Sequence, residues 1–255
     1  MIEIKKNLEY YYHLFDTYDV FQNFIKFAVR DLSPQIFVNH QKNPHCIVLY
    51  SHPAYFILGE PDESYNKDVC SLFHKNAWII ASNSAWKQVI EEIFKAGVIT
   101  HPRVFYDSEN LNLDHILSHR KPLPQGLSIE PIEKKHVEEG MIYDDVVSRF
   151  FAKNDFLTEG FGFALVDDQG TPQGFALTNY PIVGNEIELY FRVGYESCPE
   201  NRSKGIGTTL CTYFIEEALK RGYDPVWDSA NETSSHIAVK LGYIIKKTWN
   251  MFHVL

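Results

Sequence analysis

The C-terminal half of the sequence predicts an α+β fold that contains an antiparallel meander of three strands. Three observations predict it. Apolar runs at residues 160–166, 173–182 and 187–195 are separated by the turn sequences DDQG and VGN, as expected of an antiparallel meander. A glycine-containing loop then leads into residues 207–221, where apolar residues recur at helical spacing. Shorter strand and helix patterns alternate from there to the end of the chain.

Shorter elements complete this half. Residues 127–132 have the pattern of a strand, and residues 134–151 that of a largely helical segment. Beyond the long helix, residues 225–228 predict a strand and residues 233–241 a short helix closed by a glycine. Residues 244–254 predict the final strand.

The N-terminal half predicts an α/β domain. Apolar residues at helical spacing over residues 8–30 indicate one or two helices. Apolar runs bounded by turn residues then predict three strands, at 47–50, 55–58 and 77–81, and residues 84–95 have the pattern of an amphipathic helix.

The boundary between the halves is expected at residues 119–126, where prolines and a glycine interrupt any periodic pattern. This divides the chain into domains of residues 1–124 and 125–255. The element order between residues 47 and 95 loosely mirrors the C-terminal meander and loop helix, although no glycine loop accompanies it. The first domain is therefore open to two interpretations, a degenerate copy of the second or an unrelated cap.

Composition and charge exclude several classes of protein. Hydrophobic residues make up 45% of the chain and the formal net charge is −9, so the protein is expected to be globular and to repel nucleic acid. No run is long and apolar enough for a signal peptide or a membrane span, which predicts a cytoplasmic protein without a membrane partner. The four cysteines lack metal-ligand spacing, so we expect no metal site.

The segment 202–208 carries the strongest local signal for chemistry. It reads RSKGIGT and lies between a predicted strand and an apolar-faced helix. Glycines there let backbone N–H groups approach an anion, and the following helix N-terminus adds partial positive charge. The segment therefore predicts a pyrophosphate cradle. It contains neither the GK[ST] of a nucleotide P-loop nor the GxGxxG of a dinucleotide site.

Two sequence blocks together resemble the GNAT (GCN5-related N-acetyltransferase) superfamily. The block CPENRSKGIG at 198–207 is similar to that family's acyl-CoA loop, and WDSANETSSHIAVKLGY at 227–243 is similar to its N-x-x-A-x-x-x-Y-x-K-x-G-F signature. The resemblance covers residues 127–255 and is closest to bacterial GNAT-like proteins with an extra N-terminal segment. The departures from the family pattern are Ser197 for Val, Ser203 for Gly, Ser234 for Ala, Ala238 for Tyr and Tyr243 for Phe.

The resemblance implies a GNAT fold, in which a central mixed, mostly antiparallel sheet is flanked by helices. It also implies an acetyl-CoA co-substrate. It implies that the strand before the loop splays from its neighbour, so that backbone near Tyr195 to Cys198 pairs with the pantetheine arm. Asn231 would lie near the thioester, although an asparagine there is equally an ordinary helix N-cap. The CoA-binding residues carried over from the family are Ser197, Cys198, Arg202, Ser203, Lys204, Gly205, Ile206, Gly207, Thr208, Asn231 and Ser234.

Catalytic residues are harder to assign. Many GNAT enzymes use the signature tyrosine as a general acid, and this chain has Ala238 there, so Tyr243, another tyrosine, water or nothing takes its place. Strand alternation makes Glu188 the candidate general base, with a solvated or Arg192-paired carboxylate as the alternative. Cys198 suits direct transfer within a ternary complex better than a covalent intermediate.

These observations favour an N-acyltransferase that moves an acetyl group from acetyl-CoA to a small-molecule or amino-terminal amine. A CoA-binding regulatory or scaffold protein with a degraded site is the main alternative, because Ala238 replaces the usual acid. A protein-interaction module that uses the many aromatic residues is the third. The sequence leaves the acceptor, the acyl chain preference and the oligomeric state open.

Overall fold

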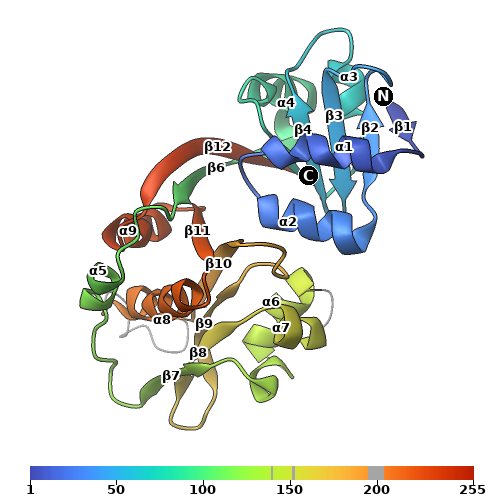
Figure 1. The fold of residues 1–255 in the computed structure, drawn as a ribbon. Helices are drawn as coiled ribbons and strands as arrows, with labels where there is room; N and C mark the ends of the chain where they lie inside the picture. The colour runs from blue at the N-terminus through green and yellow to red at the C-terminus, as the bar shows by residue number, and fades with distance from the viewer. Residues whose placement is uncertain (139, 151–152, 195–203) are drawn as a thin grey trace. The chain divides into compact units, whose positions relative to one another are not determined.

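A computed structural model describes residues 1–138, 140–150, 153–194 and 204–255. The chain forms two compact units, which are coloured by residue number in Figure 1. The first unit consists of Met1–Val104 and Lys247–Leu255, and the second of Phe105–Lys246. Strands β6 (Val98–Asp107) and β12 (Ile244–Val254) each contribute residues to both units. Residues 119–126, where the sequence predicts a linker, belong to the second unit.

The first unit has a mixed sheet in the order β1-β2-β3-β4-β5-β12. Its pairs are antiparallel except for β4 and β5, which are parallel. Its elements are β1 (Ile2–Ile4), α1 (Leu8–Leu14), α2 (Gln22–Phe27), β2 (Gln35–Val38), β3 (Cys46–Ser51), β4 (Ala54–Gly59), α3 (Asn66–Cys70), β5 (Trp78–Ala81) and α4 (Trp86–Phe94).

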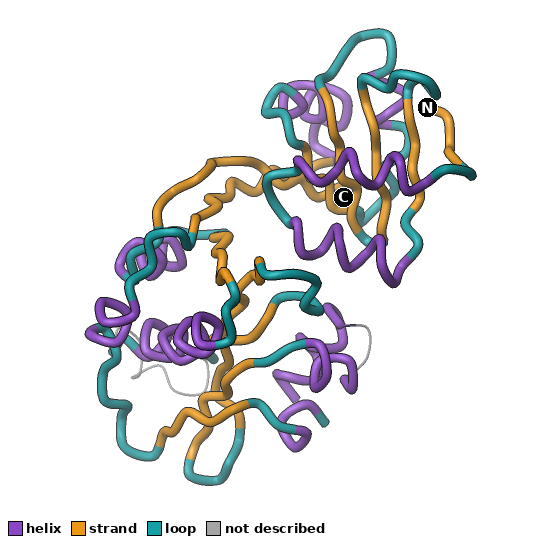
Figure 2. The backbone as a smooth tube through the Cα atoms, in the orientation of Figure 1, coloured by secondary structure: helices purple, strands orange, loops and turns teal. Residues whose placement is uncertain are grey.

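Alternation along β4 buries both faces of this sheet. Tyr55 and Ile57 point to one face and share a core cluster with Trp86 of α4. Phe56 points to the other face, where its ring stacks on Phe24 of α2 with centroids 5.5 Å apart. Because helices cover both faces, the strands read as apolar runs and not as an alternating pattern. Figure 2 shows these helices on the two sides of the strands.

The second unit contains the predicted antiparallel meander, in the order β11-β10-β9-β8-β7. The three pairs among β7 to β10 are antiparallel, and β10 and β11 are parallel. Its elements are α5 (Leu113–Ser118), β7 (Leu127–Pro131), α6 (Gly140–Phe150), α7 (Lys153–Glu159), β8 (Gly162–Asp167), β9 (Pro172–Thr178), β10 (Glu186–Val193), α8 (Ile206–Lys220), β11 (Asp224–Ser229) and α9 (Glu232–Lys240).

Helices cover this sheet on both faces as well. Phe175 and Leu177 of β9 share a core cluster with Val146 of α6. On the opposite face, Phe163 of β8 contacts Tyr213 of α8, with ring centroids 5.8 Å apart. Figure 1 shows α8 on one side of β8 to β10, and α6 and α7 on the other. The helix that follows the glycine loop is thereby fixed across the sheet.

The two units repeat one topology. Each runs as a strand, two helices, three strands, a helix, a strand, a helix and a strand. The parallel pair falls at the same place in both, at β4–β5 and at β10–β11. The last strand of the second copy completes the sheet of the first unit, since β12 pairs with β5 through Met251 and Ile80. Of the two interpretations that the sequence left open for the first domain, the structure favours the copy.

Candidate functional site

The strands β10 and β11 form a fork. Their parallel ladder joins Glu186–Glu188 to Asp224–Val226, while β10 runs on to Val193 and β11 to Ser229. Beyond the ladder β10 stays in register with β9 as far as Val193. The splay that the sequence resemblance implies is therefore present. An extended ligand arm could add as a strand at the inner edges of such a fork.

Helix α8 follows β10 along the chain, and its N-terminus offers backbone N–H donors. Its N-cap, Gly205, has φ +82°, a left-handed conformation that favours glycine. The backbone N–H groups of residues 205 to 208 precede the first intrahelical bond, from Thr209 N–H to Gly205 C=O at 2.9 Å. Its first turn holds no acidic residue. The backbone N–H donors, the positive end of the helix dipole and the lack of an acidic residue in this turn all favour the binding of a pyrophosphate.

The two glycines of this turn have different surroundings. A Cβ at Gly205 would lie 3.3 Å from the Lys121 side chain, so a larger residue would crowd the mouth of the turn. A Cβ at Gly207 would meet Phe191 and Ile237 at 3.6 and 3.7 Å, which are ordinary contact distances. Gly205 is therefore required by backbone conformation, while Gly207 lies between α8, β10 and α9. The residues present fit the pyrophosphate of CoA.

Asn231 and Ser234 have structural partners of their own. Asn231 is the N-cap of α9, and its Oδ1 accepts a hydrogen bond from Ser234 N–H at 2.9 Å. The buried Ser234 Oγ accepts from Trp227 Nε1 at 2.9 Å. The N-cap interpretation of Asn231 is confirmed, and its contact with CoA stays a prediction.

Glu188 is the last β10 residue in the parallel ladder, so it lies where the fork opens. Its side chain is buried, and its Oε1 accepts a hydrogen bond from Asn179 Nδ2 at 2.9 Å. Arg192, the alternative partner considered from sequence, has its Nη1 3.3 Å from Asp145 Oδ2. A buried carboxylate therefore lies at the fork, and its role as a general base stays a prediction.

Two positions considered for a general acid, Ala238 and Tyr243, both lie in the core. Ala238 lies in α9, is fully buried and has no proton to give. Tyr243 is also buried, and its hydroxyl donates to Pro225 C=O at 2.8 Å. Burial holds the pKa of Tyr243 well above its ordinary value, with the Cys211 thiol as a smaller cause. Tyr243 is therefore part of the core, and its hydroxyl is bonded within the unit.

A segment that the sequence reads as a linker lies against α8. Arg120 donates from Nη2 to Glu216 Oε2 at 2.7 Å and from Nε to Thr212 Oγ1 at 3.0 Å. Its guanidinium stacks on Tyr213, 3.8 Å from the ring centroid. Sequence reasoning missed this packing, although the run His119 to Lys121 offers a basic cluster as a signal. Ser197, Cys198, Arg202 and Ser203 lie outside the described residues.

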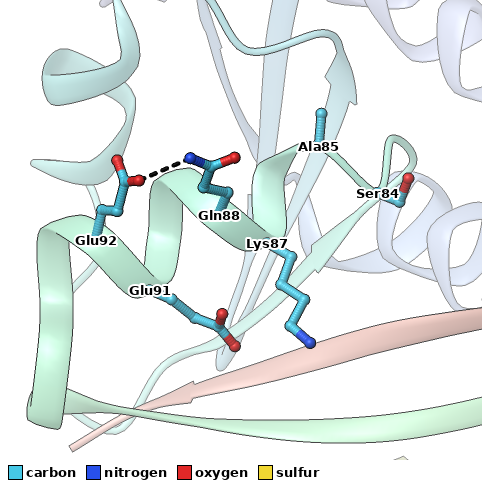
Figure 3. Close-up of a pocket in the computed structure, with 6 residues that line it drawn as sticks. All are labelled: Ser84, Ala85, Lys87, Gln88, Glu91 and Glu92. Carbon is cyan, nitrogen blue, oxygen red and sulfur yellow. Dashed lines mark hydrogen bonds between the residues drawn. The ribbon is translucent and has the colours of Figure 1, made fainter.

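Other features of the described residues lie outside this turn and fork. A surface hollow of about 520 Å³ borders α4 in the first unit (Figure 3), and its lining comes from that helix and the turn before it. Among the residues that the structure describes, no group of three or more histidine, cysteine or acidic side chains is arranged to hold a metal ion. Within the same described part, no helix combines the length and apolar character needed to cross a membrane.

Comparison with known families decides what this arrangement belongs to. The sequence pattern of the GNAT acetyltransferase family matches residues 13–252. The chain belongs to the GNAT acetyltransferase family. The match begins in α1 and ends in β12, so family likeness extends beyond residues 127–255, where the sequence motifs lie, and includes the first unit. Among curated proteins, none matches the sequence.

Solved structures share the fold of this GNAT protein. A GCN5-related N-acetyltransferase-like protein from Streptococcus suis has a TM-score of 0.75 at 21% identity, over 97% of this chain and 99% of that one. A GCN5-related N-acetyltransferase from Kribbella flavida has a TM-score of 0.55 at 14% identity, over 92% and 95%. A tandem GNAT protein from the clavulanic acid biosynthesis pathway has a TM-score of 0.54 at 11% identity, over 87% and 82%.

Proposed function

We propose that this GNAT protein binds acetyl-CoA in its second unit and transfers the acetyl group directly to an amine in a ternary complex. The observation that carries the proposal is the fork between β10 and β11, which opens on the same strand that leads toward the N-terminus of α8. The segment between β10 and α8 thus has a strand edge for a pantetheine arm at its start and an anion site for a pyrophosphate at its end. Membership of the GNAT family supports this assignment.

The residues proposed to hold the co-substrate follow from this geometry. The first turn of α8 offers backbone N–H groups, and Thr208 is buried within it. Asn231 and Ser234 would border the acyl end from α9. The residues expected to bind are Lys204, Gly205, Ile206, Gly207 and Thr208, together with Ser197, Cys198, Arg202 and Ser203 from the sequence motif.

The proposed chemistry needs a neutral amine. Its nitrogen attacks the thioester carbonyl carbon, a C–N bond forms, the C–S bond breaks, and CoA leaves as the thiolate. Glu188 would accept the proton that the nitrogen loses, and Asn179 holds the Glu188 carboxylate in place at 2.9 Å. Because Ala238 cannot donate a proton, the departing thiolate would be protonated by water. We therefore expect slow turnover, since loss of a general acid typically costs about a hundredfold or more.

Only the second unit is proposed to bind CoA. In the first unit, the loop after β4 occupies the topological place of the cradle and carries Glu60, Asp62 and Glu63. The following helix, Asn66–Cys70, is short. Carboxylates at that place would repel a pyrophosphate. Isothermal titration calorimetry should therefore give one CoA per chain, and a stoichiometry of two would contradict the proposed division between the copies.

Thiol release from acetyl-CoA in the presence of an amine library tests the transfer step. With an accepted amine, Glu188→Gln should lower turnover by about a hundredfold while leaving CoA affinity unchanged, because glutamine can still accept from Asn179. Glu138→Gln, an exposed carboxylate of the same unit, provides the charge-matched control. The pH–rate profile of the parent should fall on the acid side. Identical profiles for the parent and Glu188→Gln would remove Glu188 from the mechanism.

A second candidate function is CoA binding without transfer. The observation that favours it is that neither Ala238 nor Tyr243 offers a proton donor to the site. Ala238 has no acidic proton, and the buried Tyr243 hydroxyl donates to Pro225 C=O. CoA binding by calorimetry without thiol release for any amine would support this alternative. Failure of CoA to bind at millimolar concentration would contradict both functions.

A further inference from the structure

The connector between α5 and β7 is fixed on α8 at two points. Arg120 is anchored on Glu216, Thr212 and the ring of Tyr213. The next residue, Lys121, donates its backbone N–H to Thr209 Oγ1 at 3.1 Å. Thr209 is buried in the first turns of α8, so the position of the Lys121 backbone is set by the helix itself.

The Lys121 side chain passes over the N-cap of α8. Relative to a Cβ built on Gly205, its Cδ, Cε and Nζ lie at 3.3, 3.8 and 3.9 Å. The whole end of the side chain thus runs alongside Gly205, and the ammonium lies at the mouth of the proposed cradle. The residue is exposed, so a ligand can reach it from solvent.

This placement is electrostatically unfavourable for a lysine unless an anion is present. The N-terminus of a helix carries partial positive charge, and cations are stabilising at the opposite end. The first turn of α8 contains no acidic residue that could offset this. Of the residues that the structure describes, none forms an ion pair with Lys121. A lysine ammonium beside the positive end of a helix is an arrangement that suits a pyrophosphate.

We propose that Lys121 is a binding residue for the pyrophosphate of CoA, supplied from outside the loop between β10 and α8. The inference rests on the proposed function and deepens it. Backbone N–H groups of α8 would hold the phosphate oxygens from below, and the Lys121 ammonium would pair with their charge from the side of the connector. The contacts of Arg120 with α8 would then also position Lys121 beside the cradle.

Calorimetric titration of the full chain with CoA tests the inference. Lys121→Gln should weaken binding about tenfold, the size expected for loss of one charge-assisted contact in an exposed site. Lys121→Arg keeps the charge and should stay within about threefold of the parent. Lys42→Gln, which makes the same charge change in an exposed loop of the first unit, should bind like the parent.

Two further readouts separate a pyrophosphate contact from other roles. 3′-Dephospho-CoA keeps the pyrophosphate, so Lys121→Gln should lose the same factor with it as with CoA. In the absence of ligand, Lys121→Gln should melt at the parent temperature or slightly above, because it removes a cation from a helix N-terminus. A purely structural role would instead lower the melting temperature of the free protein.

The outcomes distinguish this inference from the proposed function. If the parent binds CoA and Lys121→Gln binds equally well, the inference fails and the proposed function stands. A loss that vanishes with 3′-dephospho-CoA overturns the pyrophosphate assignment and indicates the 3′-phosphate. Absence of CoA binding by the parent overturns the proposed function, and the inference with it.

Discussion

Alanine substitutions at the two glycines of the α8 turn, Gly205 and Gly207, should affect the stability of the folded protein differently. Gly205 has φ +82°, and an L-residue in that region costs roughly 1–2 kcal/mol. Alanine also stabilises by restricting the unfolded chain, by about 0.4–1 kcal/mol, so Gly205→Ala should cost about 1 kcal/mol net. The added Cβ meets only the flexible end of Lys121, 3.3 Å away, which can move aside.

Gly207→Ala is the matched variant in the same turn. Its backbone is helical and its new Cβ would contact Phe191 and Ile237 at 3.6 and 3.7 Å, without a clash. Alanine is favoured over glycine in a helix by about 0.5–1 kcal/mol, so this variant should be as stable as the parent or slightly more stable. The two variants should therefore differ by roughly 1–2 kcal/mol.

Differential scanning calorimetry without ligand measures this difference. For a domain of this size 1 kcal/mol corresponds to about 2–4 °C, so Gly205→Ala should melt several degrees below Gly207→Ala. Gly205→Ala melting at or above the parent temperature would show that Gly205 does not adopt the left-handed conformation. A clear loss in Gly207→Ala would show that the space beside α8 is tighter than its contact distances indicate.

Three further perturbations test other parts of the structure. Asn231→Ala should destabilise the protein by about 1 kcal/mol through loss of the α9 N-cap, while Asn231→Ser should keep most of that stability in urea unfolding. Burial raises the pKa of Cys46 and of Cys70 to about 12, so at pH 8 iodoacetamide should label neither until urea is added, as peptide mass spectrometry can check. Hydrogen bonds from the side chains of Lys220, the larger cause, and Arg120 lower the pKa of the Glu216 carboxyl below its ordinary value of 4.5. Ionised Glu216 therefore stabilises the folded state above pH 4.5, and this stability is lost as the pH falls through the lowered pKa. Glu216→Gln should flatten the fall in the free energy of unfolding on the acid side. An unchanged fall would contradict the linkage.

Local sequence pattern predicted most of the second unit. The turns between the meander strands, the apolar face of α8 and the glycine that ends α9 are all short-range signals, and each falls where the structure has the element. Strands β6 and β2 were not predicted, since Pro102 interrupts the pattern of β6 and β2 is only four residues long. The short helix α5 was missed for the same reason, since few turns give little periodicity.

The candidate site divides in a similar way. The glycine loop and the N-cap at Asn231 are readable from sequence because each is made by neighbours in the chain. The position of Glu188 on its strand follows from alternation, but its partner Asn179 comes from the end of the adjacent strand, and only the register brings them together. Tyr243 could be considered as an acid from sequence alone, and only the structure shows that it is buried with its hydroxyl bonded to Pro225 C=O.

The sequence by itself determined the order of elements in the second unit and the family motifs, and it predicted a phosphate site at the turn that begins α8. Tertiary structure alone decided that the first unit repeats the topology of the second, and that its sheet takes its last strand from the end of the chain. It also decided that Lys121 lies over Gly205, 84 positions further along the sequence. The physical reason is that strand pairing and ion pairs such as Arg120 with Glu216 depend on surfaces that meet only after the chain has folded, whereas turns, caps and amphipathic faces depend on residues a few positions apart.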